Sequence, residues 1–439
     1  MKKVYGLLAV LLLCLALVSC ATPEDSSNVA YSLSREGYTL DKIVILSRHN
    51  IRSPLSGEGS ALGGITPHSW HKWSSGTSML SVRGGSLEVQ MGQYFRRWLE
   101  AQSLITPNYM PAGDVRIYSN SKQRTIATAR FFSAGLFPVA DVPVEYHMDF
   151  DLMDPVFTPQ LTFVSDAYND AVCAQVEQLF SEDITSLDSA YRLIEDVIDF
   201  DKSPAFLSGS AEELTTTDFN LVLKLNEEPA VTGSLKTACQ ISDALVLQYF
   251  EEPDVRKAGF GKKLSLSQWE EISRVKDVYG DVLFTAPLVA VNVAHPLLSE
   301  LLGEMKNSSR IISFLCGHDS NVGSVLAALD VEPYSLENTI EKKTPIGCKV
   351  VFSRWKASSG QAFWSADLVY QSSEQLRGNE ILDLENPPQV YTLHFQGLEE
   401  SAPGLYREDI FFSRFKNAIS AYHELLRQYK TTPTKHSGV

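Results

Sequence analysis

The chain has few basic residues for its length, and nowhere do they form a block. It contains 439 residues, with 38 Lys and Arg against 53 Asp and Glu, and its formal net charge is −15 at pH 7. Nucleic-acid binding relies on clustered cations that release counterions, so nucleic acid is excluded as the main partner. An acidic protein also repels anionic ligands unless the binding site is locally positive.

Several familiar catalytic patterns are missing as well. The sequence has no Cys-x-x-Cys pair, which argues against a zinc knuckle or a redox motif, and no Gly-x-Ser-x-Gly elbow. Internal repeats and long low-complexity segments are also absent. Hydrophobic residues make up 44% of the chain and charged residues 21%. This is the composition of a globular protein with a large core.

The one long apolar run, residues 4–18, is too short for a membrane span, which needs about 20 residues. Behind Lys2 and Lys3 it has the length of a signal-peptide core. It leads into Leu-Val-Ser-Cys at 17–20, which resembles a bacterial lipobox. We therefore predict a signal peptide over 1–19, lipidation of Cys20, a linker over 20–38, and export to the periplasm or outer membrane with a lipid anchor in the membrane. The alternatives are a plain secretory signal and an uncleaved anchor.

Export changes how the remaining cysteines are interpreted. Apart from Cys14 in the signal peptide and Cys20, the chain has Cys173, Cys239, Cys316 and Cys348. In an oxidising compartment these four can form up to two disulfides in three connectivities, among which the sequence does not choose.

Strand-like and helix-like segments alternate over much of the chain. Apolar strands are expected within 41–47, 115–118 and 310–316, helices over 86–102, 122–133 and 409–429, and a hairpin from 349–355 and 363–370. The segment 163–283 is rich in Asp, Glu, Leu and Ser, and we predict that it is largely helical. We predict an α/β fold with a mostly parallel central sheet, flanking helices and an inserted helical domain. The α/β core then consists of 39–162 and 284–439.

Two motifs follow buried strands directly. Arg48-His49-Asn50-Ile51-Arg52-Ser53-Pro54 follows the first, and Gly317-His318-Asp319-Ser320-Asn321 follows a later one. Ligands of open α/β sheets bind at the carboxyl ends of strands, so the two histidines can meet there. A third cation, Arg124, follows the strand at 115–118. Taken singly, the first motif also suits a solvated basic turn, and the second suits a helix start capped by Asp319 or Ser320.

Together these motifs resemble the histidine acid phosphatase branch of the histidine phosphatase superfamily, and most closely its bacterial periplasmic glucose-1-phosphatase type. Further similar stretches run over most of the chain from about residue 40: 119–129, 153–155, 344–347 and 370–377. One departure is Asn50, where the family usually has Gly. Asn is among the residues most tolerant of a positive φ, and we expect its amide to be able to reach the substrate.

The resemblance implies hydrolysis of small phosphomonoesters through a phosphohistidine, without metal or cofactor. His49 would be the nucleophile and Asp319 the general acid, while Arg48, Arg52, Arg124 and His318 would bind phosphate. It suggests glucose 1-phosphate and inositol hexakisphosphate as substrates. The alternatives are a phytase-type inositol polyphosphate phosphatase and a non-catalytic phosphosugar-binding lipoprotein.

The loop after the first strand has two further features. Trp70 and Trp73 suit either a sugar-binding wall or simple packing of the loop. His68 and His71 are three residues apart, which is conceivable for a metal pair, but no convincing carboxylate partner lies nearby in the sequence.

Overall fold

The computed structural model describes residues 33–55 and 61–430. The predicted signal peptide, Cys20 and most of the predicted linker lie outside these residues. Leu33 and Arg35, at the end of the predicted linker, pack onto the sheet: Leu33 is buried, and Arg35 pairs with buried Asp367 at 2.7 Å. The ordered fold therefore begins before Tyr38.

A central sheet of eight strands has the order β10-β8-β7-β1-β6-β2-β3, with β9 paired to β8. Neighbours from β1 to β3 pair in parallel, and β7, β9 and β10 run the other way, so five strands share one direction. The predicted α/β class and the β7–β8 hairpin are confirmed. The strands are β1 (Tyr38–Arg48), β2 (Val115–Ser119), β3 (Val144–Glu145), β6 (Ile312–Gly317), β7 (Lys349–Ala357), β8 (Ala362–Tyr370), β9 (Gln389–Thr392) and β10 (Tyr406–Arg407).

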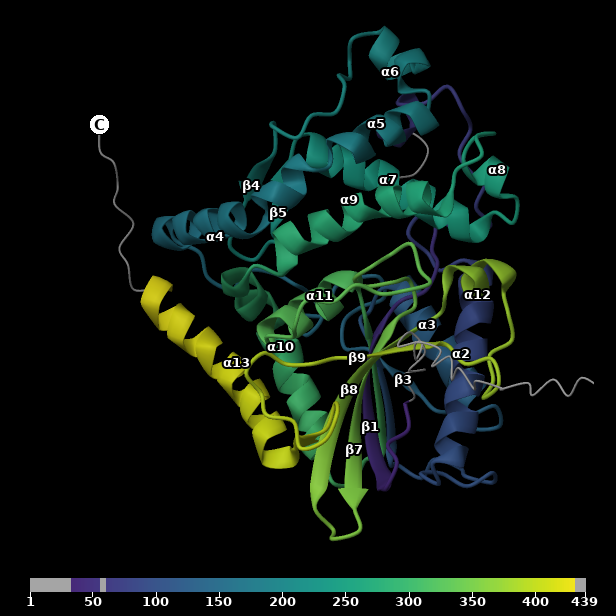
Figure 1. The fold of residues 1–439 in the computed structure, drawn as a ribbon, viewed down its shortest axis with the longest axis vertical. Helices are drawn as coiled ribbons and strands as arrows, with labels where there is room; N and C mark the ends of the chain where they lie inside the picture. Colours follow the sequence, from purple (N-terminus) through teal and green to yellow (C-terminus); the bar gives the residue numbers. More distant parts are fainter. Residues whose placement is uncertain (1–32, 56–60, 431–439) are drawn as a thin grey trace, which may run out of the picture.

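Helices cover both faces of this sheet (Figure 1). Alternate residues of β1 point to opposite faces, so Ile43 and Ile45 join the core under α2 and α3, while Val44 and Leu46 join the core under α10, α11 and α13. A strand buried on both faces must be apolar throughout, which explains its continuous hydrophobic run. These helices are α2 (Val82–Ala101), α3 (Gln123–Leu136), α10 (Pro287–Lys306), α11 (Asp319–Ala328) and α13 (Glu408–Lys430).

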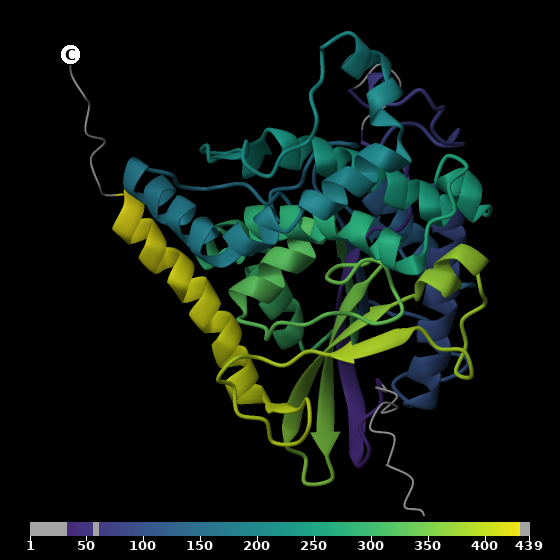
Figure 2. The same cartoon turned by 45° about the horizontal axis from the view of Figure 1, so that its top comes forward.

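A helical layer lies across the end of the sheet to which β1 runs (Figures 1 and 2). It has its own core, which includes Tyr191, Leu245 and Trp269. The region expected to be helical also contains a small hairpin, β4 (Asn220–Val222) with β5 (Ala230–Thr232). The residue limits of the inserted domain stay a prediction. The helices of the layer are α4 (Asp166–Thr185), α5 (Asp188–Val197), the 3-10 helix η1 (Phe200–Lys202), α6 (Pro204–Leu207), α7 (Ser234–Glu251), α8 (Val255–Ala258) and α9 (Leu266–Phe284).

Two short helices, α1 (Ala61–Gly64) and α12 (Ser373–Gly378), contribute Leu62 and Leu376 to the same core. Within the described ranges no single helix is both long and apolar enough to cross a bilayer, and α9 with α10 pass that test only as a pair bent by 83°.

The cysteines do not form the disulfides that export allowed. Cys173, Cys239, Cys316 and Cys348 are all free thiols. Cys316 lies on β6 and Cys348 directly precedes β7, and β1 runs between these two strands. Two strand spacings amount to roughly 9–10 Å, more than the ~7 Å between Cα atoms that a disulfide can bridge.

Candidate active site

The parallel pairing of β1 with β6 brings the two histidines together. Arg48 lies opposite Gly317 in the register, so His49 and His318 leave the same sheet edge side by side. Their ring centroids are 5.5 Å apart and their planes cross at 72°. On the other side of β6, β2 ends at Ser119, and α3 begins a few residues later with Arg124 in its first turn.

The turn after β6 depends on a close approach that only glycine permits. A Cβ on Gly317 would lie 2.4 Å from Oδ1 of Asn321 and 3.0 Å from the ring of Phe157. The Asn321 oxygen is that close because it accepts the backbone N–H of His318 at 2.9 Å. This contact starts α11 at Asp319 and places its carboxylate at the helix N-terminus, where negative charge is favoured.

His49 is buried, and its ring is held in one tautomer. Nδ1 lies 2.8 Å from the carbonyl oxygen of Asn50. A carbonyl only accepts, so Nδ1 carries the proton and the lone pair is on Nε2. Burial, then Arg124 and His318, hold the pKa of His49 well below its usual value. The imidazole is therefore neutral and nucleophilic in acidic medium.

The three predicted arginines surround this ring with different partners. Arg48 is buried and pairs with Asp319 at 3.1 Å and Glu341 at 2.9 Å. Arg52 pairs with Asp243 at 3.1 Å. Arg124 instead faces the ring of His318, with Nη2 3.4 Å from Nδ1. Burial and the charge of Arg52 lower the pKa of Arg124 to about 10, so it remains a cation in acidic and neutral medium.

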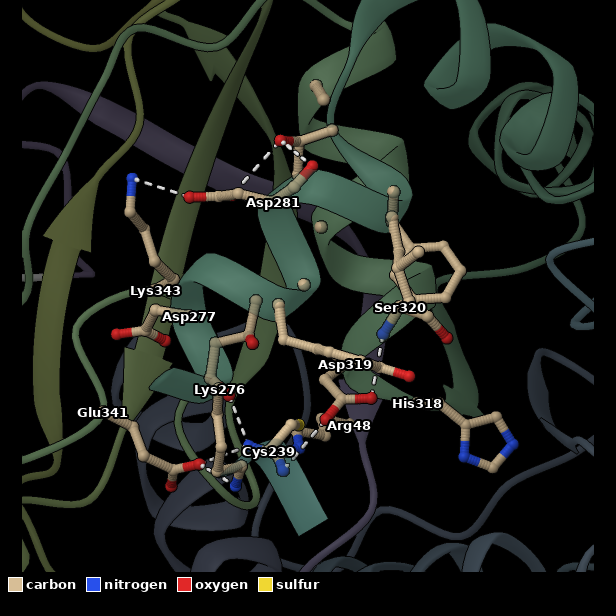
Figure 3. A pocket seen from close by; sticks show the side chains of 18 of the residues that line it. Arg48, Cys239, Lys276, Asp277, Asp281, His318, Asp319, Ser320, Glu341 and Lys343 are labelled. Carbon is tan, nitrogen blue, oxygen red and sulfur yellow. Dashed lines mark hydrogen bonds and ion pairs between the residues drawn. The ribbon is translucent and has the colours of Figure 1, made fainter. Parts of the chain in front are cut away.

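Three charged residues beside the arginines were missed by sequence reasoning. Lys276 of α9 lies 3.0 Å from Glu341 and 3.4 Å from Asp243 of α7. Figure 3 shows Lys276 and Glu341 beside Arg48. Their positions in the sequence are far from either motif and match no pattern, so only folding reveals them. Glu341 and Asp243 hold the guanidinium groups of Arg48 and Arg52, and Lys276 bridges the two carboxylates.

Asp319 lines the pocket, with its side chain 44% exposed and directed at Arg48 (Figure 3). Partial burial raises the pKa of its carboxyl, but Arg48, Lys276 and Arg52 outweigh burial and keep the pKa below its usual range. In the free protein Asp319 is therefore ionised.

The pKa of His318 is also lowered well below its usual value, by burial and by Arg124. His318 faces the pocket as a neutral ring.

Asn50 does not reach the pocket as expected. It is buried, and its Nδ2 donates to Oε1 of Glu88 at 2.8 Å. Glu88 in turn pairs with Lys349 at 3.0 Å, and both of those side chains are fully buried. The family usually has glycine at this position, which allows a positive φ, but the φ of Asn50 is not positive. The amide anchors the loop from behind instead of touching substrate.

The tryptophans and histidines of the loop after β1 also lie away from the pocket lining. Trp70 and Trp73 pack against the core of the helical layer, so the sugar-wall interpretation is wrong. His68 pairs with Asp199 at 2.6 Å, whereas His71 lies 3.5 Å from Glu252. Across residues 33–55 and 61–430, no group of three or more His, Cys, Asp or Glu side chains is arranged to hold a metal ion.

The site opens into a pocket of about 850 Å³ between the sheet edge and the helical layer. Its charged lining is nearly balanced, with seven Arg and Lys and eight Asp and Glu. The basic residues are Arg48, Arg52, Lys122, Arg124, Lys236, Lys276 and Lys343, and the acidic ones are Glu228, Asp243, Asp277, Asp281, Asp319, Asp330, Glu332 and Glu341. The cationic part of the site is the cluster of Arg48, Arg52 and Arg124 around His49, whereas Lys343 of the lining lies 3.9 Å from Asp281.

Comparisons with known proteins agree with this geometry. The family model of the histidine phosphatase superfamily (branch 2) matches residues 39–369. A glucose-1-phosphatase of Salmonella typhimurium is 38% identical, covering 88% of this chain and 94% of that protein. A phytase of Escherichia coli (strain K12) is 27% identical, covering 89% and 94%. The structure of the Hafnia alvei phytase shares the fold, with a TM-score of 0.80, 24% identity, and coverage of 89% and 99%. The chain therefore belongs to branch 2 of the histidine phosphatase superfamily and is a phosphomonoester hydrolase of the acid phosphatase type.

Proposed function

We propose that this protein is an exported histidine acid phosphatase that removes single phosphate groups from small phosphomonoesters, with glucose 1-phosphate as the preferred candidate. The observation that carries the proposal is the neutral, buried His49 ring within a cluster of Arg48, Arg52 and Arg124. Such a ring can attack phosphorus while the guanidinium groups neutralise the phosphate oxygens.

In the first step Nε2 of His49 attacks phosphorus and the bond from phosphorus to the leaving oxygen breaks. Nδ1 keeps its proton on the Asn50 carbonyl, so the lone pair of Nε2 is available. Arg48, Arg52 and Arg124 bind the three equatorial oxygens, where a loose transition state spreads its charge. These cations perform the charge neutralisation that many phosphatases assign to a metal.

Asp319 would supply the proton that the leaving oxygen takes. It is ionised in the free protein, but a bound phosphate places negative charge beside it and raises its pKa. In acidic medium the carboxyl is then protonated in the complex, donates to the leaving oxygen, and recovers a proton from the water that hydrolyses the phosphohistidine. Because the first step needs this proton, we expect activity to fall as pH rises through the pKa of Asp319 in the complex.

The charge balance of the pocket supports a substrate with one phosphate. Inositol hexakisphosphate carries six phosphates, and five of them would face the rest of a lining in which eight acidic side chains outnumber seven basic ones. Glucose 1-phosphate places one anion in the cationic part and hydroxyl groups against the acidic part, where carboxylates accept hydrogen bonds. The phytase-type alternative has in its favour the shared fold and the relative at 27% identity.

The test is phosphate release from glucose 1-phosphate and from inositol hexakisphosphate, with EDTA present, from acidic to neutral pH. We expect faster release from glucose 1-phosphate, an acidic optimum and no effect of EDTA, with His49→Ala inactive. If phosphate is released from neither substrate, the proposed enzymatic activity is refuted, and the non-catalytic phosphosugar-binding lipoprotein becomes the favoured alternative. Faster release from inositol hexakisphosphate would favour the phytase type, and loss of activity with EDTA would refute the metal-free mechanism.

A further inference from the structure

Asn120, the residue directly after β2, lies behind the His318 ring and is fully buried. Its Nδ2 lies 2.7 Å from Nε2 of His318 and also donates to the sulfur of Met153 at 3.1 Å. Asn120 belongs to the stretch 119–129 that resembles the family, and it is not one of the six residues proposed for the site.

The orientation of the Asn120 amide is determined by its other contacts. Oδ1 accepts the backbone N–H of Ser121 at 2.8 Å and that of Asp154 at 2.9 Å. Two backbone donors require an oxygen at that position, because an NH2 group there would face N–H groups. The NH2 group of Asn120 therefore faces His318, and Nε2 of that ring must accept.

This contact determines where the proton of His318 lies. A proton on Nε2 would point at the Asn120 N–H across 2.7 Å, so neutral His318 must carry its proton on Nδ1. Nδ1 lies 3.4 Å from Nη2 of Arg124. A neutral imidazole has one acceptor nitrogen, so it cannot accept from both Asn120 and Arg124. The Asn120 contact is the shorter, at 2.7 Å against 3.4 Å, and we take Nε2 as the acceptor. Nδ1 of His318 and Nη2 of Arg124 are then both donors, and a phosphate oxygen between them would accept from the two.

We propose that Asn120 is a positioning residue that holds His318 in the Nδ1–H tautomer, so that His318 presents a donor to phosphate while His49 presents a lone pair. The two histidines are thus held in opposite tautomers by groups behind them, the Asn50 carbonyl for His49 and the Asn120 amide for His318. The role of Asn120 in turnover rests on the proposed function, whereas the tautomer of His318 does not depend on it.

The charges that face His318 come from several elements. Arg124 of α3, Arg52 of the loop after β1 and Lys122 before α3 disfavour a second proton on the ring, and Asp319 of α11 favours one. Asn120 acts in the same direction as the cations, because its N–H leaves no acceptor for a proton on Nε2.

The first experiment measures the ring nitrogens of His318 by NMR in the whole protein labelled with 15N-histidine. His318→Gln identifies which signals disappear. We expect a protonated Nδ1 and an unprotonated Nε2 from acidic to neutral pH. A protonated Nε2, whether in the other neutral tautomer or in the imidazolium, overturns the proposal. This measurement does not depend on activity, so it stands apart from the fate of the proposed function.

The second experiment uses Asn120→Asp, which has the same shape but puts an acceptor beside Nε2. The carboxylate favours a proton on Nε2, so at high pH the neutral ring turns its unprotonated Nδ1 toward phosphate. We expect kcat/KM of Asn120→Asp to gain a new alkaline limb that falls as pH rises through the pKa of His318. An unchanged pH profile overturns the proposal.

Two companion variants separate positioning from stability. Asn120→Ala frees the ring to take either tautomer, and we expect about a tenfold loss of kcat/KM, as for one hydrogen bond of typical strength. Tyr118→Phe is the control, since it removes the 2.8 Å contact to Asp154 in the same network without touching His318. Tyr118→Phe should lower thermal stability and keep the tautomer and the pH profile. If the pH profile of kcat/KM also shifts in Tyr118→Phe, then loosening the hydrogen-bond network is enough to change the profile. That result would overturn the specific role of Asn120.

Discussion

At the residue scale, the protonation of His49 is set by its surroundings. The ring is buried, and Arg124, His318, Arg52 and Arg48 all disfavour a second proton on it. The same guanidinium groups that are proposed to bind phosphate thus keep the nucleophile neutral. One set of charges performs both tasks, and a single substitution should therefore change both.

Arg124→Gln should move the acidic limb of the pH profile. Loss of this cation raises the pKa of His49, and the ring is a nucleophile only above that pKa, so the limb moves to higher pH. KM should rise as well, because one phosphate donor is lost. The measurement is kcat/KM against pH. Arg130→Gln on the exposed side of the same helix is the matched control, and an equal shift in both variants would contradict the prediction.

At the scale of elements, the helical layer contributes directly to the site. Asp243 of α7 holds Arg52, and Lys276 of α9 contacts both Asp243 and Glu341. The phosphate cluster is therefore built on the sheet edge and completed by two helices from the other half of the fold.

Lys276→Met should move the alkaline limb of the pH profile of kcat to higher pH. Lys276 is one of the cations that lower the pKa of Asp319. Without it that pKa rises, the general acid stays protonated to higher pH, and the alkaline limb of kcat moves upward. Arg274→Met removes a cation of the same helix that pairs with Glu271 and Ser186 away from the pocket. An alkaline limb that stays in place in Lys276→Met would refute the role given to this lysine.

A second contact between elements lies behind His49. Lys349 of β7 pairs with Glu88 of α2, and Glu88 accepts a hydrogen bond from the side-chain amide of Asn50. Glycine is needed at position 347 beside them, since φ there is +72° and a Cβ would lie 2.5 Å from Nδ2 of Asn50. The loop that carries the nucleophile is thus attached to both a strand and a helix.

Lys349→Met should destabilise the protein by about 3–5 kcal/mol, because it leaves the Glu88 carboxylate buried without a counter-charge. Chemical denaturation measures this free energy of unfolding. Adding Glu88→Gln removes the uncompensated charge and keeps an acceptor for Asn50, so the double variant should regain much of the loss. A double variant as unstable as Lys349→Met would mean that packing, and not charge, determines the cost.

At the scale of the whole molecule, an acidic protein places three arginines around one buried histidine. The net charge of −15 excluded a general polyanion binder, and the lining of seven basic and eight acidic residues restricts the cationic part further. The predicted lipid anchor belongs to the same scale, since it would hold the whole enzyme at a membrane.

Cys20→Ala should release the protein from the membrane fraction of a bacterial host without changing its phosphatase activity, because Cys20 lies ahead of the folded domain. Fractionation with labelled fatty acid measures both anchoring and lipidation. Absence of label on the unaltered chain would refute the lipoprotein prediction and favour the plain secretory signal.

Much of the fold followed from the sequence because its signals are local. A strand buried on both faces must be apolar, as at 43–46, and a helix must repeat its apolar residues at a fixed spacing, as at 86–102. The histidine motifs were recognisable because each lies at a strand end. The small hairpin β4–β5 and the packing of residues 33–37 carry no comparable pattern.

The class of the fold, the family and the six residues proposed for the site could be predicted from the sequence, since each rests on local pattern or on a motif of neighbouring residues. How those residues are used depends on contacts that form only when the chain folds. The amide of Asn50 turns away from the pocket, Lys276 and Asp243 join from distant helices, and Asn120 orients His318. The physical reason is that charge and hydrogen bonding depend on distance in space, and that distance is set by packing between elements that the chain keeps far apart.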